Sequence, residues 1–210
     1  MKLAVFGGSG RTGVPLLQQA LEKGYVIKVL VRDPSKLTIR HKNLQVIKGD
    51  AMNWSDVDKT IEHADVVLSV LGQNKDSPAK MQTTAFEHIV RAMKKHGVTR
   101  VISLTGAGVE DPENDKPKLV NHLIKAMLKM MAGKVYRDAR GHSDLLRESG
   151  LDWTIVRVPM LNDNAFTGKY RVGSVGVNTG TKICRADIAD FMLKQIDSRE
   201  YIHRLPMISN

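Results

Sequence analysis

Seven residues near the N-terminus, Gly7-Gly8-Ser9-Gly10-Arg11-Thr12-Gly13, have the composition of a phosphate-binding turn. They can be read as G-x-G-x-x-G from Gly8 or as G-x-x-G-x-x-G from Gly7. Glycine supplies positive φ without steric cost, and the missing Cβ lets the backbone approach a pyrophosphate. The N-terminus of a following helix would add amide donors and a partial positive charge. Because the turn follows an apolar run and opens a helical pattern, the sequence predicts a dinucleotide site here.

The residues after the second apolar run bear on which dinucleotide is bound. A carboxylate at this place accepts the ribose 2′-hydroxyl of NAD, whereas an arginine suits the 2′-phosphate of NADP. Asp33 precedes Pro34, which can occupy the first helical position, so Asp33 is well placed as a helix N-cap. Arg32 then has no evident structural role, and Arg11 and Lys36 add positive charge nearby. The sequence therefore favours NADP(H), with a solvated strand-end charge as the alternative for Arg32.

The elements that must position these residues alternate along the chain. Short apolar runs predict buried strands, and apolar residues at helical spacing predict helices between them. Gly24 is placed as the stop signal of the first helix. The expected strands are 3–6, 26–31, 44–47, 65–71, 101–104 and 153–158, and the expected helices are 14–22, 55–62, 79–95, 119–148 in two pieces broken near Gly133, and 186–196.

This strand–helix alternation predicts a single α/β domain over residues 1–210. Parallel strands joined by right-handed crossover helices give a doubly wound, Rossmann-type sheet. Its ligand crevice lies beyond the carboxyl ends of the strands, where the candidate residues above are placed. The segment 159–181 is expected to form loops that complete a substrate site.

The composition is that of an ordinary globular protein, with 42% hydrophobic and 26% charged residues. No apolar run approaches the roughly 20 residues of a membrane span, and MKLAVFGGSG is too short and too glycine-rich for a signal peptide. The single cysteine, Cys184, excludes an internal disulfide, fits a reducing cytosol and is expected to be buried and inert. We therefore expect a cytoplasmic protein without a membrane partner.

The net charge of +10 is spread along the chain rather than gathered in one tract. That distribution disfavours nucleic acid as the main partner. It suits an anionic dinucleotide or an acidic substrate equally well.

Four segments of the chain, and the order in which they occur, resemble those of the atypical short-chain dehydrogenase/reductase group. The segments are FGGSGRTG, VLVRDPSKL, GDAMNWSDV and LRESGLDWTIVRVPML. This NAD(P)H-binding branch includes the NmrA-like proteins and the biliverdin reductase B, or flavin reductase, proteins, to which the chain is most similar. The resemblance covers residues 1–196 and implies a Rossmann domain. It implies NADPH contacts along the glycine turn and at Arg32, Asp50, Ala51, Met52, Leu71, Gly72, Thr105 and Gly106, to which the sequence adds Lys36 as a nearby positive charge. For Asp50, a turn or capping role is an equal alternative.

The chain departs from that group at the positions that carry catalysis. Classical members use a Tyr-x-x-x-Lys pair, and only Tyr136 and Arg140 have this spacing here. Flavin and biliverdin reductases carry a serine after the fifth strand and a histidine after the sixth, where this chain has Gly106 and Met160. Thr105 and Tyr136 are the remaining catalytic candidates. The absence of the Tyr-x-x-x-Lys pair argues mainly against ketone reduction, because the alkoxide that develops there needs a proton donor. It argues less against the reduction of a flavin or a quinone.

The expected substrate pocket consists of Pro159, Met160 and His142, with the nicotinamide facing Pro159 and Met160. His142 has a solvated helix position as its alternative. The methionine-rich stretch 127–131 is expected either to pack in a helix core or to form a lid over an aromatic substrate. Trp153 is expected in the core.

The seven histidines show no metal-binding spacing, so no metal is expected.

Two functions from different classes fit these patterns. The first is an NADPH-dependent oxidoreductase that transfers hydride to a flavin, a quinone or a similar planar conjugated molecule. The second is a non-catalytic NADP(H)-binding redox sensor of NmrA type, which acts through a protein partner. The lost serine, histidine and lysine positions favour the sensor, whereas the lack of an evident partner-binding appendage disfavours it.

Overall fold

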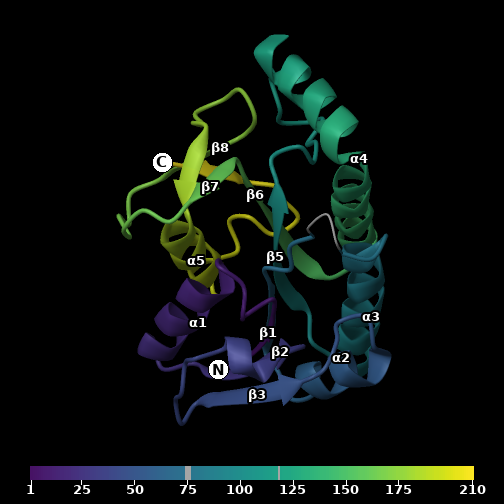
Figure 1. Ribbon diagram of the computed structural model, residues 1–210, viewed down its shortest axis with the longest axis vertical. Helices are drawn as coiled ribbons and strands as arrows, with labels where there is room; N and C mark the ends of the chain where they lie inside the picture. The colour runs from purple at the N-terminus through teal and green to yellow at the C-terminus, as the bar shows by residue number, and fades with distance from the viewer. Residues whose placement is uncertain (74–76, 118) are drawn as a thin grey trace.

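A central sheet of eight strands organises the computed structural model, which describes residues 1–73, 77–117 and 119–210 (Figure 1). Within its longest helix only the backbone of residues 119–132 is described. The strand order is β3-β2-β1-β4-β5-β6-β10-β8, and β7 and β9 form a separate two-stranded sheet. The strands are β1 Lys2–Phe6, β2 Val26–Val31, β3 Leu44–Lys48, β4 Val66–Ser69, β5 Arg100–Gly106, β6 Asp152–Val158, β7 Met160–Asn162, β8 Arg171–Gly173, β9 Lys182–Cys184 and β10 Met207–Ser209.

All strand pairs from β3 to β10 are parallel, and only the edge strand β8 runs antiparallel. Phe6, at the end of β1, is paired with Leu30 of β2 on one side and with Ser69 of β4 on the other. The chain order of the strands therefore reverses at β1. A crevice opens beyond the carboxyl ends of the strands at such a point, which places it next to Gly7.

Helices cover both faces of the sheet (Figure 1). The first and last helices contact each other on one face, and three central helices lie on the other. No described helix combines the length and the apolar character that crossing a membrane requires. The helices are α1 Gly13–Glu22, α2 Trp54–Ile61, α3 Met81–His96, α4 Leu119–Arg147 and α5 Arg185–Lys194, with a short 3-10 helix η1 at Pro34–Lys36.

The structure confirms the predicted doubly wound α/β fold. Gly24 adopts a left-handed conformation with φ of +80°, as a helix stop requires. The predicted break of α4 at Gly133 is wrong, because the helix runs unbroken from Leu119 to Arg147. A glycine inside a helix costs only about 1 kcal/mol relative to alanine, and good helix formers flank this one. Trp153 and Cys184 are buried.

The segment that was expected to consist of loops contains short strands. Met160–Asn162 pairs with Lys182–Cys184, and Arg171–Gly173 extends the main sheet beside β10. Strands of three residues leave too few positions for an alternating pattern to be recognised in the sequence. This error matters for the site, because a strand fixes which side chains face inward.

A buried guanidinium holds the loop that follows β5. Arg157 of β6 is completely buried and donates to both carboxylate oxygens of Asp115, at 2.7 and 2.9 Å. It also donates to the carbonyls of Val109 at 3.1 Å and Leu205 at 2.8 Å. A desolvated cation is tolerated when it is paired and hydrogen-bonded in this way. The network fixes Val109, which lines the cavity described below.

Candidate cofactor and substrate site

The turn between β1 and α1 is packed so closely that three of its glycines are required by the fold. Gly7 has a φ of +84°, and a Cβ on it would come within 2.8 Å of the Val70 backbone. A Cβ on Gly8 would overlap the side chain of Val29, and one on Gly13 would overlap the carbonyl oxygen of Gly7. These contacts press the turn against β2 and β4. No larger residue fits at these positions.

Gly10 differs from the other three glycines. Like Gly8 and Gly13 it does not have positive φ, but a Cβ on it would meet only the carbonyl oxygen of Gly7, at 3.3 Å. The general expectation that positive φ explains the glycines of this turn therefore holds for Gly7 and not for Gly10. Gly10 itself is exposed. The protein leaves space at this position, which is what a phosphate approaching the backbone needs.

The N-terminus of α1 offers amide donors toward this space. Thr12 is the N-cap residue, but its side chain makes no capping hydrogen bond, and the first turn of α1 contains no acidic residue. Helix N-terminal amides without a capping side chain are commonly satisfied by an anion. The open position at Gly10 and the uncapped helix together fit a pyrophosphate.

The predicted N-cap role of Asp33 is confirmed. Its carboxylate accepts hydrogen bonds from the backbone N–H of Ser35 at 3.1 Å and from the Ser35 hydroxyl at 2.7 Å. The hydroxyl hydrogen bond of Ser35 is the main reason why the pKa of Asp33 is lowered. Lys36 Nζ lies 4.0 Å from the same carboxylate. Arg32 is exposed and makes no hydrogen bond or ion pair with any residue that the structure describes.

Asp50 follows β3 and has a turn role. Its Oδ1 accepts from the backbone N–H of Met52 at 2.9 Å, and its own N–H donates to Asp56 at 3.0 Å. The carbonyl of Ala51 lies 3.4 Å from His88 Nδ1. The turn alternative given for Asp50 is thus present in the structure, and whether it also meets a cofactor stays a prediction.

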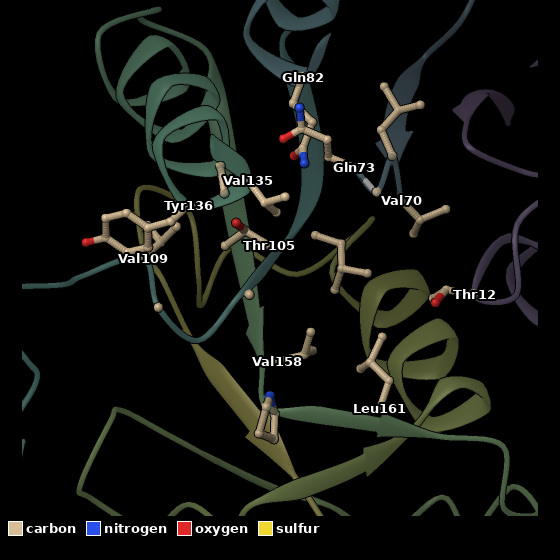
Figure 2. Close-up of a pocket in the computed structure, with 17 residues that line it drawn as sticks. Thr12, Val70, Gln73, Gln82, Thr105, Val109, Val135, Tyr136, Val158 and Leu161 are labelled. Atoms are coloured by element: carbon tan, nitrogen blue, oxygen red, sulfur yellow. The ribbon is translucent and has the colours of Figure 1, made fainter. Parts of the chain in front are cut away.

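A cavity of about 350 Å³ extends from the glycine turn across the carboxyl ends of β4, β5 and β6 (Figure 2). Apolar side chains make up most of its wall. Among the residues that the structure describes, no aspartate, glutamate, lysine, arginine or histidine lines it. The lining residues are Thr12, Val70, Leu71, Gly72, Gln73, Gln82, Leu104, Thr105, Gly106, Gly108, Val109, Val135, Tyr136, Ala139, Val158, Pro159 and Leu161.

Both catalytic candidates lie in this wall, in different surroundings. Thr105 is 5% exposed, and its Oγ1 is buried without a hydrogen-bond partner among the described residues. Tyr136 is half-buried beside Gly108, and Figure 2 shows its hydroxyl pointing away from Thr105. Arg140, which occupies the lysine place of the expected pair, is exposed and lies 3.6 Å from Asp144. The structure therefore does not place Arg140 at the cavity.

Met160 lies outside the cavity, and its side chain is 67% exposed. Its neighbours Pro159 and Leu161 line the cavity instead. Because Met160 begins the strand β7, successive side chains point to opposite sides, and Leu161 faces inward. The sequence analysis missed Leu161 because it expected a loop here. The side chains of the methionine stretch 127–131 lie outside the described residues.

His142 is neither solvated nor exposed to the cavity. It is completely buried beneath the wall, where its Nε2 lies 3.3 Å from the Ser103 hydroxyl. Its ring packs on Phe86 with a centroid separation of 4.7 Å. Burial lowers the pKa of His142 to about 4, so the imidazole is neutral at neutral pH. Both roles expected for His142, substrate contact and a solvated helix position, are thus wrong.

The comparisons with known proteins agree with this geometry. The model of a family described as NAD(P)H-binding matches residues 7–199. The (4-alkanoyl-5-oxo-2,5-dihydrofuran-3-yl)methyl phosphate reductase of Streptomyces griseus is 23% identical over 83% of this chain, which spans 53% of that protein. Among solved structures, a short-chain dehydrogenase/reductase from Veillonella parvula in complex with NADP has a TM-score of 0.82, with 18% identity over 100% of this chain and 94% of that one. ChuY, an anaerobillin reductase from Escherichia coli O157:H7, has a TM-score of 0.81, with 21% identity over 100% of this chain and 97% of that one.

The buried imidazole predicts a pH dependence of stability. The folded-state pKa of His142, about 4, lies below the ordinary histidine value of 6.5, so between these values the unfolded chain binds a proton that the folded chain does not. The contribution to the free energy of unfolding is complete above pH 6.5 and falls as the pH drops toward 4, by about 3 kcal/mol in total. We expect His142→Gln to remove this slope, so that its stability difference from wild type shrinks as the pH falls.

Urea unfolding of both proteins between pH 7 and pH 4 measures that difference. His63→Asn, at an exposed position with positive φ that asparagine tolerates, is the control and should follow the wild-type curve. Parallel curves for wild type and His142→Gln would contradict the assignment of a neutral buried imidazole.

Proposed function

The chain belongs to the NAD(P)H-binding family, and we propose that it is an NADPH-dependent reductase that delivers hydride to a planar, conjugated acceptor such as a flavin or a quinone. The observation that supports this most is the cavity itself. It adjoins the glycine turn, its wall is mostly apolar, and none of the described residues that line it is charged. Such a wall suits the flat face of an uncharged ring system and excludes water from it.

The proposed reaction requires few catalytic groups from the protein. NADPH, when bound, supplies the hydride; the acceptor gains two electrons and one further proton, and NADP⁺ is released. Flavin and quinone oxygens or nitrogens can take that proton from water, so a resident acid is not essential. Thr105, whose hydroxyl lies in the wall, is the side chain we propose to position the acceptor. Tyr136 has its hydroxyl turned away, which suits a minor role.

We propose NADPH rather than NADH on the basis of the end of β2. Asp33 is engaged in capping and accepts from Ser35, whereas the exposed Arg32 makes no hydrogen bond or ion pair with the described residues. An arginine in this place suits a 2′-phosphate. The structure from Veillonella parvula in complex with NADP is consistent with this choice. The names of the Streptomyces and Escherichia coli relatives, both reductases, support the direction of the reaction.

The central test is anaerobic oxidation of NADPH in the presence of FMN, riboflavin, menadione and biliverdin. We expect turnover with at least one planar acceptor and none with a simple aliphatic ketone, which offers no conjugated ring to stack. If NADPH binds tightly and no acceptor is reduced, the chain is better explained as a cofactor-binding redox sensor that acts through a protein partner.

The cofactor preference is tested with Arg32→Ala. A hydrogen bond to a charged group contributes about 1.5–3 kcal/mol, or roughly 10- to 100-fold in affinity. We expect the variant to lose about this factor for NADPH and to bind NADH as wild type does, measured by fluorescence titration. Arg147→Ala removes an exposed arginine at the end of α4 and is the matched control. Equal dissociation constants of wild type for NADPH and NADH would refute the preference.

Gly10→Ala tests the position of the pyrophosphate. Because a Cβ at Gly10 meets only one protein atom, at 3.3 Å, thermal stability should change little. NADPH affinity should fall more than about tenfold, since the methyl group occupies the space that a phosphate needs. Gly13→Ala is the contrasting variant: its Cβ would overlap the carbonyl of Gly7, so stability itself should fall. Retention of NADPH affinity in folded Gly10→Ala would show that the phosphates lie elsewhere.

A further inference from the structure

Two polar side chains in the apolar cavity wall have a buried atom without a hydrogen-bond partner among the described residues, and a third side chain, Gln82, lies in the same wall. The Oε1 atom of Gln73 and the Oγ1 atom of Thr105 are buried without a hydrogen-bond partner among the described residues. The side-chain amide of Gln82, a residue only 5% exposed, also makes no hydrogen bond with them. Buried polar groups are nearly always hydrogen-bonded, so the two unpaired oxygen atoms of Gln73 and Thr105 in one cavity point to a ligand. In Figure 2 the two glutamine amides lie at one end of the lining and Leu161 lies at the other.

The main chain of Gln82 is held firmly in place. Gln82 lies in the first turn of α3, where its N–H donates to Asp138 Oδ2 at 2.8 Å. The other oxygen of Asp138 accepts from the N–H of Thr83 at 2.9 Å and from its hydroxyl at 2.6 Å. Asp138 itself is 3% exposed. A carboxylate of α4 thus fixes the start of α3, and Gln82 is positioned before any ligand arrives.

The orientation of the Gln73 amide is fixed by chemistry. Its Nε2 donates to the carbonyl of Pro78 at 2.9 Å, and a carbonyl can only accept. Its remaining atom, Oε1, is therefore a pure acceptor that needs a donor. Gln82 offers a donor and an acceptor side by side. A ligand with an N–H next to a C=O has the donor that Gln73 Oε1 lacks and an acceptor for the Gln82 amide.

We propose that Gln73 and Gln82 determine the specificity of the cavity for an acceptor whose ring edge is a cyclic imide or lactam. This inference rests on the proposed reductase function. The ring N–H donates to Gln73 Oε1, and an adjacent ring carbonyl accepts from Gln82 Nε2. Quinones present only carbonyl acceptors and leave Gln73 Oε1 unpaired, so they are poorer ligands. The described residues of the lining carry no charge, which fits a neutral edge of this kind.

A comparison of lumiflavin with 3-methyl-lumiflavin tests whether the cavity recognises the imide edge. The methyl group replaces the hydrogen of the imide N–H and leaves the rest of the ring unchanged. Binding of each to the NADP⁺-loaded protein is measured by quenching of flavin fluorescence. We expect N3-methylation to weaken binding to wild type about tenfold or more, the effect of leaving a buried acceptor unpaired. Gln82→Met, a change of similar volume, should weaken lumiflavin binding about tenfold. In Gln73→Met/Gln82→Met the two flavins should bind within about twofold of each other.

Gln18→Met, on the exposed face of α1, is the matched control and should discriminate as wild type does. Failure of lumiflavin to bind, equal binding of both flavins to wild type, or discrimination retained in the double variant would each overturn the inference. Anaerobic NADPH oxidation separates this result from the proposed function. Discrimination in binding without any turnover would refute the reductase proposal and leave the recognition of the imide edge standing.

Discussion

Close contact between the glycine turn and β4 is the constraint on which the rest of the site depends. Gly7 packs against the Val70 backbone with no room for a Cβ, and Gly13 packs against Gly7 in the same way. These contacts fix the start of α1 at the point where the strand order reverses. They bring the uncapped helix N-terminus and the end of β4 to the same crevice. A phosphate and a flat ring can therefore be bound within one continuous space, without a second domain.

The opposite wall is fixed by charge rather than by steric fit. Asp138 of α4 accepts three hydrogen bonds from the first turn of α3, and Gly141 lets the helices approach, since a Cβ there would lie 2.6 Å from the Thr83 hydroxyl. A buried carboxylate with several donors holds its geometry well. The cavity thus has one wall set by backbone contact and one set by a carboxylate. Only the side chains between them are free to determine what is bound.

The sequence was informative where a residue type has one dominant physical use. The turn glycines, the Asp33 cap and the strands after which functional residues follow were all predictable, because local chemistry decides them. His142 was not, since its burial depends on how α4 packs over Ser103 and Phe86, which lie far away in the sequence. Leu161 and Gln82 were missed for the same reason. Their inward direction follows from strand and helix geometry that three or four residues of sequence do not reveal.

An uncharged cavity also accounts for the departure from the Tyr-x-x-x-Lys pattern. A lysine near the ring would stabilise an alkoxide developing on a ketone, and Arg140, which stands in that place, lies 3.6 Å from Asp144 and outside the lining. Hydride delivery to a conjugated ring spreads the new charge over several atoms, so a single strong donor is less valuable. Weak, fixed hydrogen bonds from neutral amides and a hydroxyl suit that distributed charge. The lack of charged side chains among the described lining residues, which argues against ketone reduction, therefore favours a delocalised acceptor.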